Sequence, residues 1–213
     1  MQIKSLNIGS PQTIATTNNK FISAIRKTPT LQKVFLTKMG LKGDSCYDEK
    51  AHGGKDKALH MFCFENYTFF ESRAESKLTI PTFGENITIS NYHEKIARIG
   101  DTLQIGEVIV QVSEPTIRCS KIGMSAGFKQ MLKWIHEEFK TGFYLRVLQE
   151  GEIDVNSPVK LLNRGSEKAT IDELNRAMFC NFNKQEIIKP ILEIASLSQG
   201  WKSKLRKKAK IDA

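Results

Sequence analysis

The sequence predicts a mainly β fold with helices, in which a barrel or sandwich of short strands precedes a small helical appendage. The first observation is a series of short segments rich in β-branched or aromatic residues and bounded by Gly, Pro, Asn or Asp. The second is an alternation of apolar residues on both sides of Gly106. The third is a change of composition after residues 163–168, where strand-like segments give way to helical ones.

Seven segments carry the strand pattern, and closing them into a barrel or sandwich would remove exposed sheet edges. They are residues 2–8, 21–27, 86–89, 101–105, 107–113, 143–148 and 158–163. Two of them predict a hairpin with one buried face, because their apolar residues alternate on either side of a turn at Gly106. These apolar residues are Leu103, Ile105, Val108, Val110 and Val112.

Helical spacing interrupts the strands at residues 125–140, for which Ser125 is the expected N-cap. Its apolar positions are Phe128, Met131, Leu132, Ile135 and Phe139. Residues 64–76 form a weaker helical candidate.

The C-terminal part of the chain predicts three helices. The first opens with a capping box of Thr170 and Glu173, and the others cover residues 183–195 and 198–210. Pro190 should break or kink the middle helix. We therefore expect a β-barrel domain over residues 1–164 and a three-helix module over residues 165–213.

Composition indicates a globular protein: 40% of the 213 residues are hydrophobic and 26% are charged. The net charge of +9 admits anionic ligands without specifying one. The N-terminus has no apolar core of signal-peptide length, and no segment approaches the roughly 18 apolar residues of a membrane span. We expect a cytoplasmic protein that makes no membrane contact.

Three stretches contain residues that could carry chemistry. Residues 40–59 combine turn-forming glycines with Asp44, His52 and Lys57, and such a loop is either a turn-rich surface loop or a site for a phosphate-bearing cofactor. It matches neither a Walker A loop nor a dinucleotide fingerprint. In residues 82–89, Gly84 and Asn86 form either a simple turn or, with Glu85, a polar ligand contact.

The third stretch places Cys119 between Arg118 and Lys121, in a loop after a predicted strand. Neighbouring cations favour the thiolate, the form that attacks electrophiles and binds metals, although a free cysteine is often a small buried hydrophobe. The four cysteines form no C-x-x-C pair, and the surroundings of Cys63 and Cys180 are those of core residues. His60, His93 and His136 have no partner at metal-ligand spacing and are interpreted as ordinary surface or core residues.

Six motifs in consecutive order resemble the MOSC-domain family, and in particular its bacterial YiiM type. They are GLKGD (40–44), HGGKDKAL (52–59), FGEN (83–86), IGD (99–101), VSEP with CSK (112–115 and 119–121) and GFYLRVLQEG (142–151). The tail also resembles the three-helix module of this subgroup. The resemblance implies an antiparallel β-barrel that binds a molybdenum pterin cofactor, with Cys119 as the protein ligand to molybdenum.

The implied activity is reduction of N-hydroxylated compounds, such as hydroxylaminopurine-type base analogues, to amines. Electrons would come from a separate redox protein, because the chain has no flavin or nicotinamide motif. Pyridoxal phosphate is a second cofactor that the resemblance admits at the level of the family.

The resemblance also suggests roles for the polar residues around Cys119. Arg118 and Lys121 would lower the pKa of its thiol and neutralise the cofactor phosphate. Further phosphate or pterin contacts are expected from Gly53, Gly54 and Lys57, and polar contacts with pterin or substrate from Asp44, His52 and Asn86.

The chain departs from the family pattern near Cys119. Glu114 stands where Gln is usual, Thr116 where Arg is common and Arg118 where Pro usually precedes the cysteine. Cys46 adds a second thiol at a position where a polar residue is common.

Two alternatives remain open at this point. Cys119 could hold a persulfide, which would make the protein a sulfur carrier. A non-catalytic barrel could instead bind nucleotides or RNA through the basic tail, but this requires exposed aromatic residues, and Trp201 is the only aromatic residue in that tail. We therefore do not expect a nucleic-acid partner, and the sequence leaves the oligomeric state undetermined.

Overall fold

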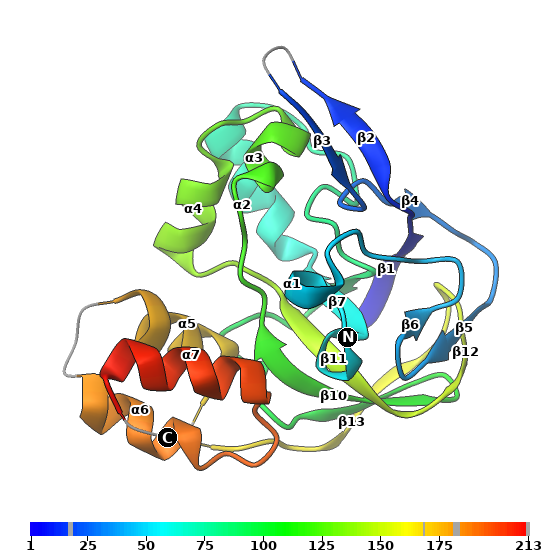
Figure 1. Ribbon diagram of the computed structural model, residues 1–213. Helices are drawn as coiled ribbons and strands as arrows, with labels where there is room; N and C mark the ends of the chain where they lie inside the picture. The colour runs from blue at the N-terminus through cyan, green and yellow to red at the C-terminus, as the bar shows by residue number, and fades with distance from the viewer. Residues whose placement is uncertain (17–18, 168, 181–183, 212–213) are drawn as a thin grey trace.

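The computed structural model describes residues 1–16, 19–167, 169–180 and 184–211 (Figure 1). A sheet in the strand order β13-β9-β10-β11-β7-β8-β1-β4 curls into a half-barrel. Its strands are β1 (Gln2–Ile8), β4 (Thr28–Pro29), β7 (Leu59–Cys63), β8 (Ile87–Ser90), β9 (Thr102–Ile105), β10 (Val108–Pro115), β11 (Phe143–Gln149) and β13 (Val159–Asn163).

Two smaller sheets and a set of helices surround the main sheet. The smaller sheets contain β5 (Val34–Thr37), β6 (Gly40–Leu41) and β12 (Gly151–Ile153), and the hairpin of β2 (Gln12–Ala15) and β3 (Lys20–Ser23). The helices are α1 (Glu49–His52), the 3₁₀ turn η1 (Lys55–Lys57), α2 (Glu65–Ala74), α3 (Lys121–Ala126), α4 (Met131–Glu138), α5 (Ile171–Phe179), α6 (Lys184–Leu192) and α7 (Gln199–Ala209).

The predicted fold class is confirmed, with one exception to antiparallel pairing. β7 and β8 are parallel, with Met61 opposite Ile87. Parallel neighbours need a crossover connection, and α2 provides it between these two strands. The sheet curls without pairing its two edge strands, β13 and β4.

The predicted hairpin at Gly106 is confirmed. β9 and β10 pair antiparallel, and Ile105 lies opposite Val108 across a two-residue turn. Gly106 has a φ of 55°, a value that favours glycine. All five alternating apolar side chains are buried, so this hairpin contributes directly to the core.

The helix expected over residues 125–140 is wrong in its extent, because two shorter helices occupy this region. Gly127 adopts a φ of 80° and ends α3, and its backbone N–H donates to Gly123 O. Ser125 lies within α3, while Gln130 precedes α4. Helical spacing of apolar residues continues through this break, so the pattern alone did not reveal it. The weaker candidate at residues 64–76 is confirmed as α2.

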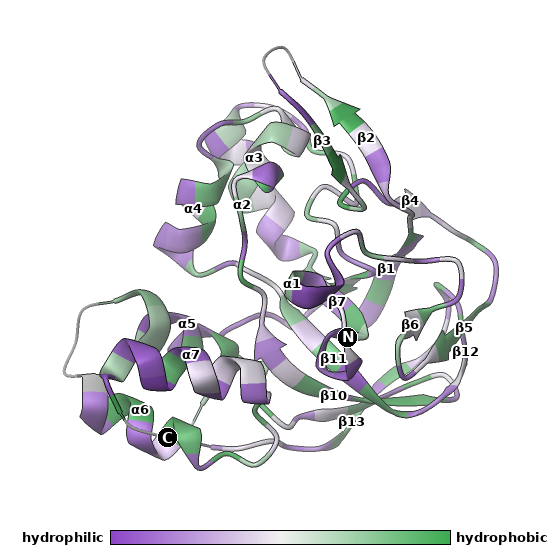
Figure 2. Cartoon of the chain, in the orientation of Figure 1, coloured by the Kyte–Doolittle hydropathy of each residue, from purple (hydrophilic) through white to green (hydrophobic). Residues whose placement is uncertain are grey.

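The C-terminal helices pack as one unit, and Figure 2 shows hydrophobic and hydrophilic segments alternating along α7. Thr170 and Glu173 form the predicted capping box of α5. α6 contains Pro190 and ends two residues later. Residue 183, where we expected this helix to begin, lies outside the described residues. Trp201 is fully buried, so it is not available to stack on a nucleic-acid base.

The apolar core is continuous from the sheet into the C-terminal helices. One cluster joins Val110 and Val112 of β10 to Leu174, Trp201 and Leu205. At the junction, the Asp101 carboxylate accepts from Gly165 N at 2.7 Å and pairs with Arg164 at 3.1 Å. The division at residue 164 stays a prediction, and the two parts share buried apolar surface across it. No helix in the described ranges is both long and apolar enough to cross a bilayer.

Candidate active site

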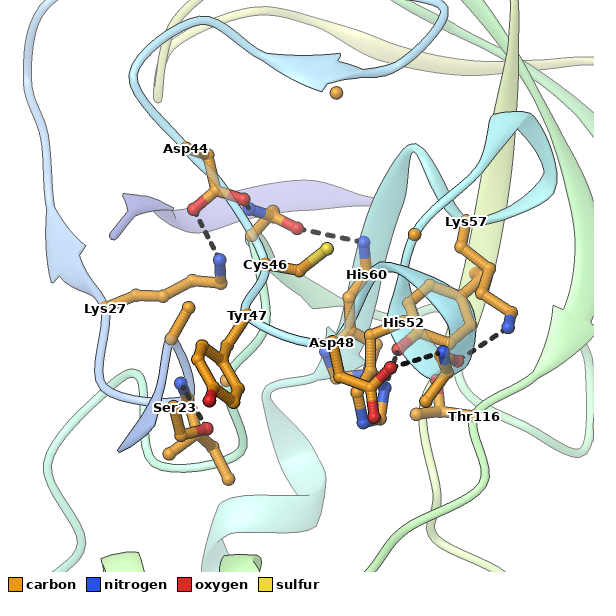
Figure 3. Close-up of a pocket in the computed structure, with 18 of the residues that line it drawn as sticks. Ser23, Lys27, Asp44, Cys46, Tyr47, Asp48, His52, Lys57, His60 and Thr116 are labelled. Carbon is orange, nitrogen blue, oxygen red and sulfur yellow. Dashed lines mark hydrogen bonds and ion pairs between the residues drawn. The ribbon is translucent and has the colours of Figure 1, made fainter. Parts of the chain in front are cut away.

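A cavity of about 390 Å³ lies where segments far apart in the sequence meet (Figure 3). Its lining residues lie within four segments: 23–27 at the end of β3 and beyond it, 39–60 around α1 and η1, 83–86 before β8 and 116–122 after β10. Tyr144 of β11 completes it. Cavities of this size with converging polar groups hold small ligands or cofactors.

The turn from α1 to η1 directs His52 and Lys57 toward this cavity. α1 begins because the Asp48 carboxylate caps it, accepting from Ala51 N at 3.0 Å. A Cβ at Gly53 would lie 2.7 Å from Glu49 O, so only glycine fits there without a shift of the backbone. Gly54 then takes a φ of 98° and leads into η1.

Cys119 ends a loop, residues 116–119, that connects β10 to α3. Its side chain is exposed and lines the cavity. Cys46 lines the same cavity but is half-buried, and burial together with the charge of Glu49 raises its pKa. Cys63 is buried away from the cavity, as expected, and burial raises its pKa to about 12. Cys180, expected in the core, is half-buried.

Three acceptors hold the Arg118 guanidinium. Its Nε donates to Thr141 O at 2.8 Å, its Nη1 to Phe83 O at 2.6 Å and its Nη2 to His60 Nε2 at 2.7 Å. An arginine has five N–H donors, so two remain. No carboxylate of the described residues forms an ion pair with Arg118. Its charge is therefore not paired by the protein on the cavity side.

His60 was not expected to be a site residue, but it lines the cavity and contacts Arg118. Because arginine can only donate, His60 Nε2 accepts, and the neutral ring carries its proton on Nδ1. Burial, followed by the charge of Arg118, lowers the pKa of His60 well below its ordinary value. The imidazole is neutral and positions Arg118.

His52 and Tyr144 form a second polar pair, with His52 Nδ1 lying 3.2 Å from the Tyr144 hydroxyl. Burial lowers the pKa of His52, and the charges of Arg118 and Lys57 lower it further. Burial raises the pKa of Tyr144. Both groups are therefore neutral near pH 7, and they share one hydrogen bond that a proton can cross.

The two predicted lysines line the cavity from different segments of the chain. Lys57 Nζ donates to Ala51 O at 2.6 Å and lies 3.9 Å from Glu114 Oε1. Lys121 Nζ lies 5.8 Å from the centre of the Tyr47 ring, in the range of a cation–π contact.

The charged side chains that line the cavity are cationic in excess. Four cations, Lys27, Lys57, Arg118 and Lys121, face two carboxylates, Asp44 and Asp48. Four minus two leaves a formal excess of +2 when the histidines are neutral, which favours an anionic ligand.

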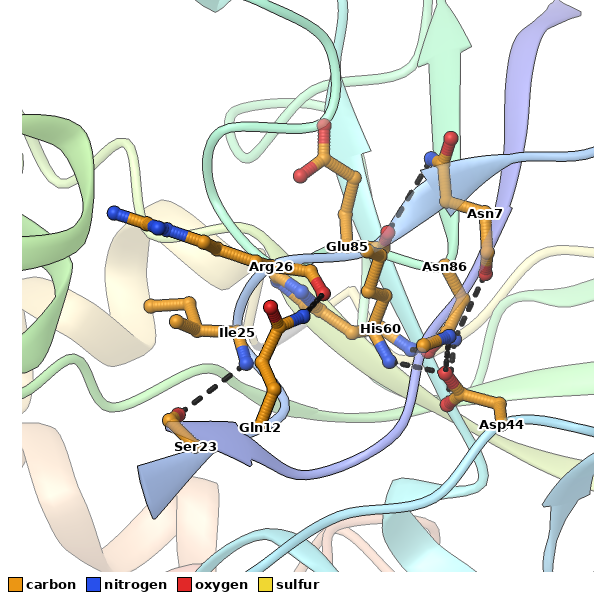
Figure 4. A network of polar contacts seen from close by, with 11 residues as sticks. Asn7, Gln12, Ser23, Ile25, Arg26, Asp44, His60, Glu85 and Asn86 are labelled. Atoms are coloured by element: carbon orange, nitrogen blue, oxygen red, sulfur yellow. Dashed lines mark hydrogen bonds and ion pairs between the residues drawn. The ribbon is translucent and has the colours of Figure 1, made fainter. Parts of the chain in front are cut away.

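Asp44 and Asn86 form a buried network with the first strand (Figure 4). The Asp44 carboxylate accepts from Gly9 N at 2.8 Å, from Asn86 Nδ2 at 2.9 Å and from Lys27 Nζ. Asn86 Oδ1 accepts from His60 N at 3.1 Å. The network fixes β1, β7 and the loop before β8 in one arrangement, and both side chains also line the cavity.

Thr116 supplies a polar atom without a partner. Its Oγ1 is buried and makes no hydrogen bond to any described residue, although Thr116 lines the cavity three positions before Cys119. Buried hydroxyls nearly always have partners, so an unpaired one beside a cavity indicates a ligand or ordered water there.

The structure brings together eight of the nine predicted site residues, since all except Gly54 line the cavity. Glu85 points into the core instead, where it accepts from Tyr67 Oη and Thr88 Oγ1. Lining residues that the sequence did not propose as site residues include Lys27, Tyr47, His60, Thr116 and Tyr144. Across the described ranges, no three His, Cys, Asp or Glu side chains gather in a metal-binding group.

Comparison with known families and proteins gives consistent matches. The family model of the MOSC domain matches residues 48–160. The uncharacterised protein YflK of Bacillus subtilis is 34% identical over 206 residues, which are 97% of this chain and 93% of that protein. Protein YiiM of Escherichia coli is 28% identical over 189 residues, 87% of this chain and 84% of its own.

A protein named reductase from Gibberella moniliformis is 29% identical over 73% of this chain, which corresponds to only 28% of that larger protein. Among solved structures, YiiM from Geobacillus stearothermophilus superimposes with a TM-score of 0.83 at 31% identity, covering 98% of both chains. YiiM from E. coli gives a TM-score of 0.79 at 22% identity, with 100% of this chain and 96% of that chain covered, a likeness of fold.

Proposed function

This chain belongs to the MOSC-domain family, and on that premise we propose that it is a molybdenum-cofactor-dependent reductase of N-hydroxylated compounds. Cys119 is the protein ligand to molybdenum in this proposal. The product is the corresponding amine, and a separate redox protein delivers the electrons. The observation that carries the proposal is the exposed Cys119 thiol at a cavity with an excess of positive charge.

The residues present fit an anionic pterin cofactor. The cationic excess suits its phosphate, and the unpaired Thr116 hydroxyl and the free donors of Arg118 suit its polar edge. In this proposal a metal at Cys119 would take ligands from the cofactor as well as from the protein. When bound, the cofactor supplies the redox centre for the reaction.

The protein residues would bind the cofactor, position the substrate and deliver protons. Lys57 and Lys121 line the cavity from different segments and would both contact the phosphate. Reduction of an N–OH group to an amine breaks the N–O bond and consumes two electrons and two protons, releasing water. The hydrogen bond between His52 Nδ1 and the Tyr144 hydroxyl offers a route for such protons.

The opening of the cavity favours planar substrates. Tyr47 and Met39 line it and are 54% and 64% exposed. An exposed aromatic ring beside a cation provides a surface on which a heteroaromatic ring stacks. This supports N-hydroxylated base analogues as the substrate class.

The test compares metal content among single-cysteine variants. The wild type, Cys119→Ala and Cys46→Ala are purified from cells that make the cofactor, and molybdenum and pterin are measured in each. We expect molybdenum in the wild type and in Cys46→Ala, and its loss in Cys119→Ala. Molybdenum that is lost only from Cys46→Ala would refute the assignment of the ligand.

The same experiment distinguishes the sulfur carrier, which the exposure of Cys119 also suits. If the wild type has no molybdenum but carries cyanide-labile sulfur on Cys119, the reductase is refuted and the sulfur carrier is supported. A metal-bearing wild type that also reduces an N-hydroxylated purine, given a chemical electron donor, would support the reductase.

A further inference from the structure

The C-terminal helices contact the strand that leads to Cys119. Ser198 is the N-cap of α7, and its backbone N–H donates to Ser113 O at 3.1 Å. Its hydroxyl donates to Glu114 Oε2. Trp201 Nε1 donates to Pro115 O at 3.0 Å. Three consecutive residues of β10 are therefore hydrogen-bonded to the start of α7.

The same helices contact the segment on the other side of the Cys119 loop. Asn175 of α5 is fully buried, and its Nδ2 donates to Thr141 Oγ1 at 2.9 Å and to Phe139 O at 3.2 Å. Thr141 O in turn accepts from Arg118 Nε at 2.8 Å. Asn175 therefore binds the side chain of Thr141, the residue whose carbonyl binds Arg118 next to Cys119.

The loop between these two attachments has little support of its own. Residues 116–119 have no regular secondary structure, and Cys119 Sγ makes no hydrogen bond to any described residue. Its place depends on the strand end before it, on Arg118 and on two backbone hydrogen bonds, from Thr116 N to Gly142 O at 3.0 Å and from Ile122 N to Cys119 O at 3.1 Å. The Glu114 carboxylate adds a third connection, since its Oε1 lies 3.9 Å from Lys57 Nζ in the cavity lining.

We propose that Ser198, Trp201 and Asn175 are positioning residues for the Cys119 loop, so that the C-terminal helices form part of the framework of the site. The functional meaning of this rests on the role proposed above for Cys119. The geometry itself can be tested by the reactivity of the thiol, without cofactor or turnover.

The experiment uses the full-length chain, made in a host that does not synthesise the pterin cofactor. The alkylation rate of Cys119 by iodoacetamide is measured by peptide mass spectrometry and divided by the rate of Cys46 in the same molecule. Ser198→Ala removes the hydroxyl contact with Glu114 and the N-cap bond to Trp201 N, and Trp201→Phe removes the indole N–H together with part of a fully buried ring. Ser203→Ala is the matched control, because Ser203 is an exposed serine of the same helix.

We expect the rate ratio to change by about threefold or more in Ser198→Ala and Trp201→Phe, since each loses a buried hydrogen bond that fixes the loop. The control should match the wild type. A purely structural role would lower the melting temperature and leave the ratio unaltered, and that result in folded Trp201→Phe would overturn the proposal.

Hydrogen exchange of the wild type keeps the proposal testable even where the variants do not fold. If the helices position the loop, the amides of residues 113, 114, 116–118 and 198–202 should open together, with similar protection. Loop amides that exchange independently of the start of α7 would contradict it. A wild-type protein that contains no molybdenum would contradict the function proposed for the site and leave this inference unaffected.

Discussion

Replacing Asp44 by Asn tests whether the hydrogen-bonded network beside the cavity contributes to the stability of the folded protein. The two side chains of the Lys27–Asp44 pair are only 7% and 14% exposed. The carboxylate also accepts from Gly9 N and Asn86 Nδ2. An asparagine side chain has one acceptor end and one donor end. In either orientation, its NH₂ group would therefore face another donor.

The magnitude follows from the burial of the pair. Removing one partner of a buried ion pair costs about 3 to 5 kcal/mol, because the remaining charge is left without compensation. The pair retains some exposure, so we take the lower end and expect a loss of about 3 kcal/mol. For a chain of this length that corresponds to a melting temperature lower by about 6 to 12 °C.

The assay is urea unfolding followed by circular dichroism, with Asp48→Asn as the matched control. Asp48 lies on the same cavity, but its carboxylate caps α1, and asparagine caps a helix equally well. The control should stay within about 0.5 kcal/mol of the wild type, as a neutral surface substitution does. If Asp44→Asn were as stable as Asp48→Asn, the reasoning about the buried pair would be refuted.

Three further predictions concern the substrate, pH and packing. Tyr47→Ala should raise the KM for planar N-hydroxylated substrates by about tenfold through loss of stacking, whereas Tyr47→Phe should not. Steady-state kinetics measures this, and an equal rise in KM for an aliphatic N-hydroxyl substrate would disprove it. Because the pKa of His60 is lowered in the folded state, His60 is protonated in the unfolded chain at a higher pH than in the folded one. The neutral His60 therefore contributes stability above the ordinary histidine pKa, and this contribution is lost as the pH falls below it. From pH 7 to pH 5, the urea midpoint should therefore decrease more for the wild type than for His60→Gln. Equal decreases would contradict the assignment. Gly142→Ala should cost about 3 kcal/mol or more in urea unfolding, because its Cβ would lie 2.7 Å from His60 Nε2. Gly127→Ala should cost only about 1 kcal/mol, since that glycine also has positive φ but open space around it, and similar losses would argue against crowding.

The parts of the fold that could be predicted from the sequence are those with local physical causes. The alternation around Gly106 predicted the β9–β10 hairpin, because the pleat of a strand places alternate side chains on one face. The capping box of Thr170 and Glu173 marked the start of α5 for an equally local reason. The parallel pairing of β7 with β8 could not be predicted in this way, since it depends on the path of α2 across the sheet.

The candidate site divides along the same line. Asp44, His52 and Cys119 were identified because glycines, charges or a thiol mark their loops, and the structure places all three on one cavity. His60 and Tyr144 lie instead within apolar strands, where a polar ring follows the pattern of the core. Only the pairing of β7 with β11, which sets Tyr144 opposite His60, shows that both rings line the cavity.

The departures from the family pattern around Cys119 acquire a physical account from the structure. The resemblance implies Gln, Arg and Pro where this chain has Glu114, Thr116 and Arg118, so the formal charges at these positions would differ by −1, −1 and +1, a sum of −1. Burial raises the pKa of the Glu114 carboxyl, which accepts from the Ser198 hydroxyl and lies 3.9 Å from Lys57 Nζ, while Arg118 adds a cation to the loop. Arg118 is held by the loop carbonyls of Phe83 and Thr141 and by His60 Nε2. Because these three contacts use three of the five N–H donors of Arg118, the other two remain for an anion that enters the cavity.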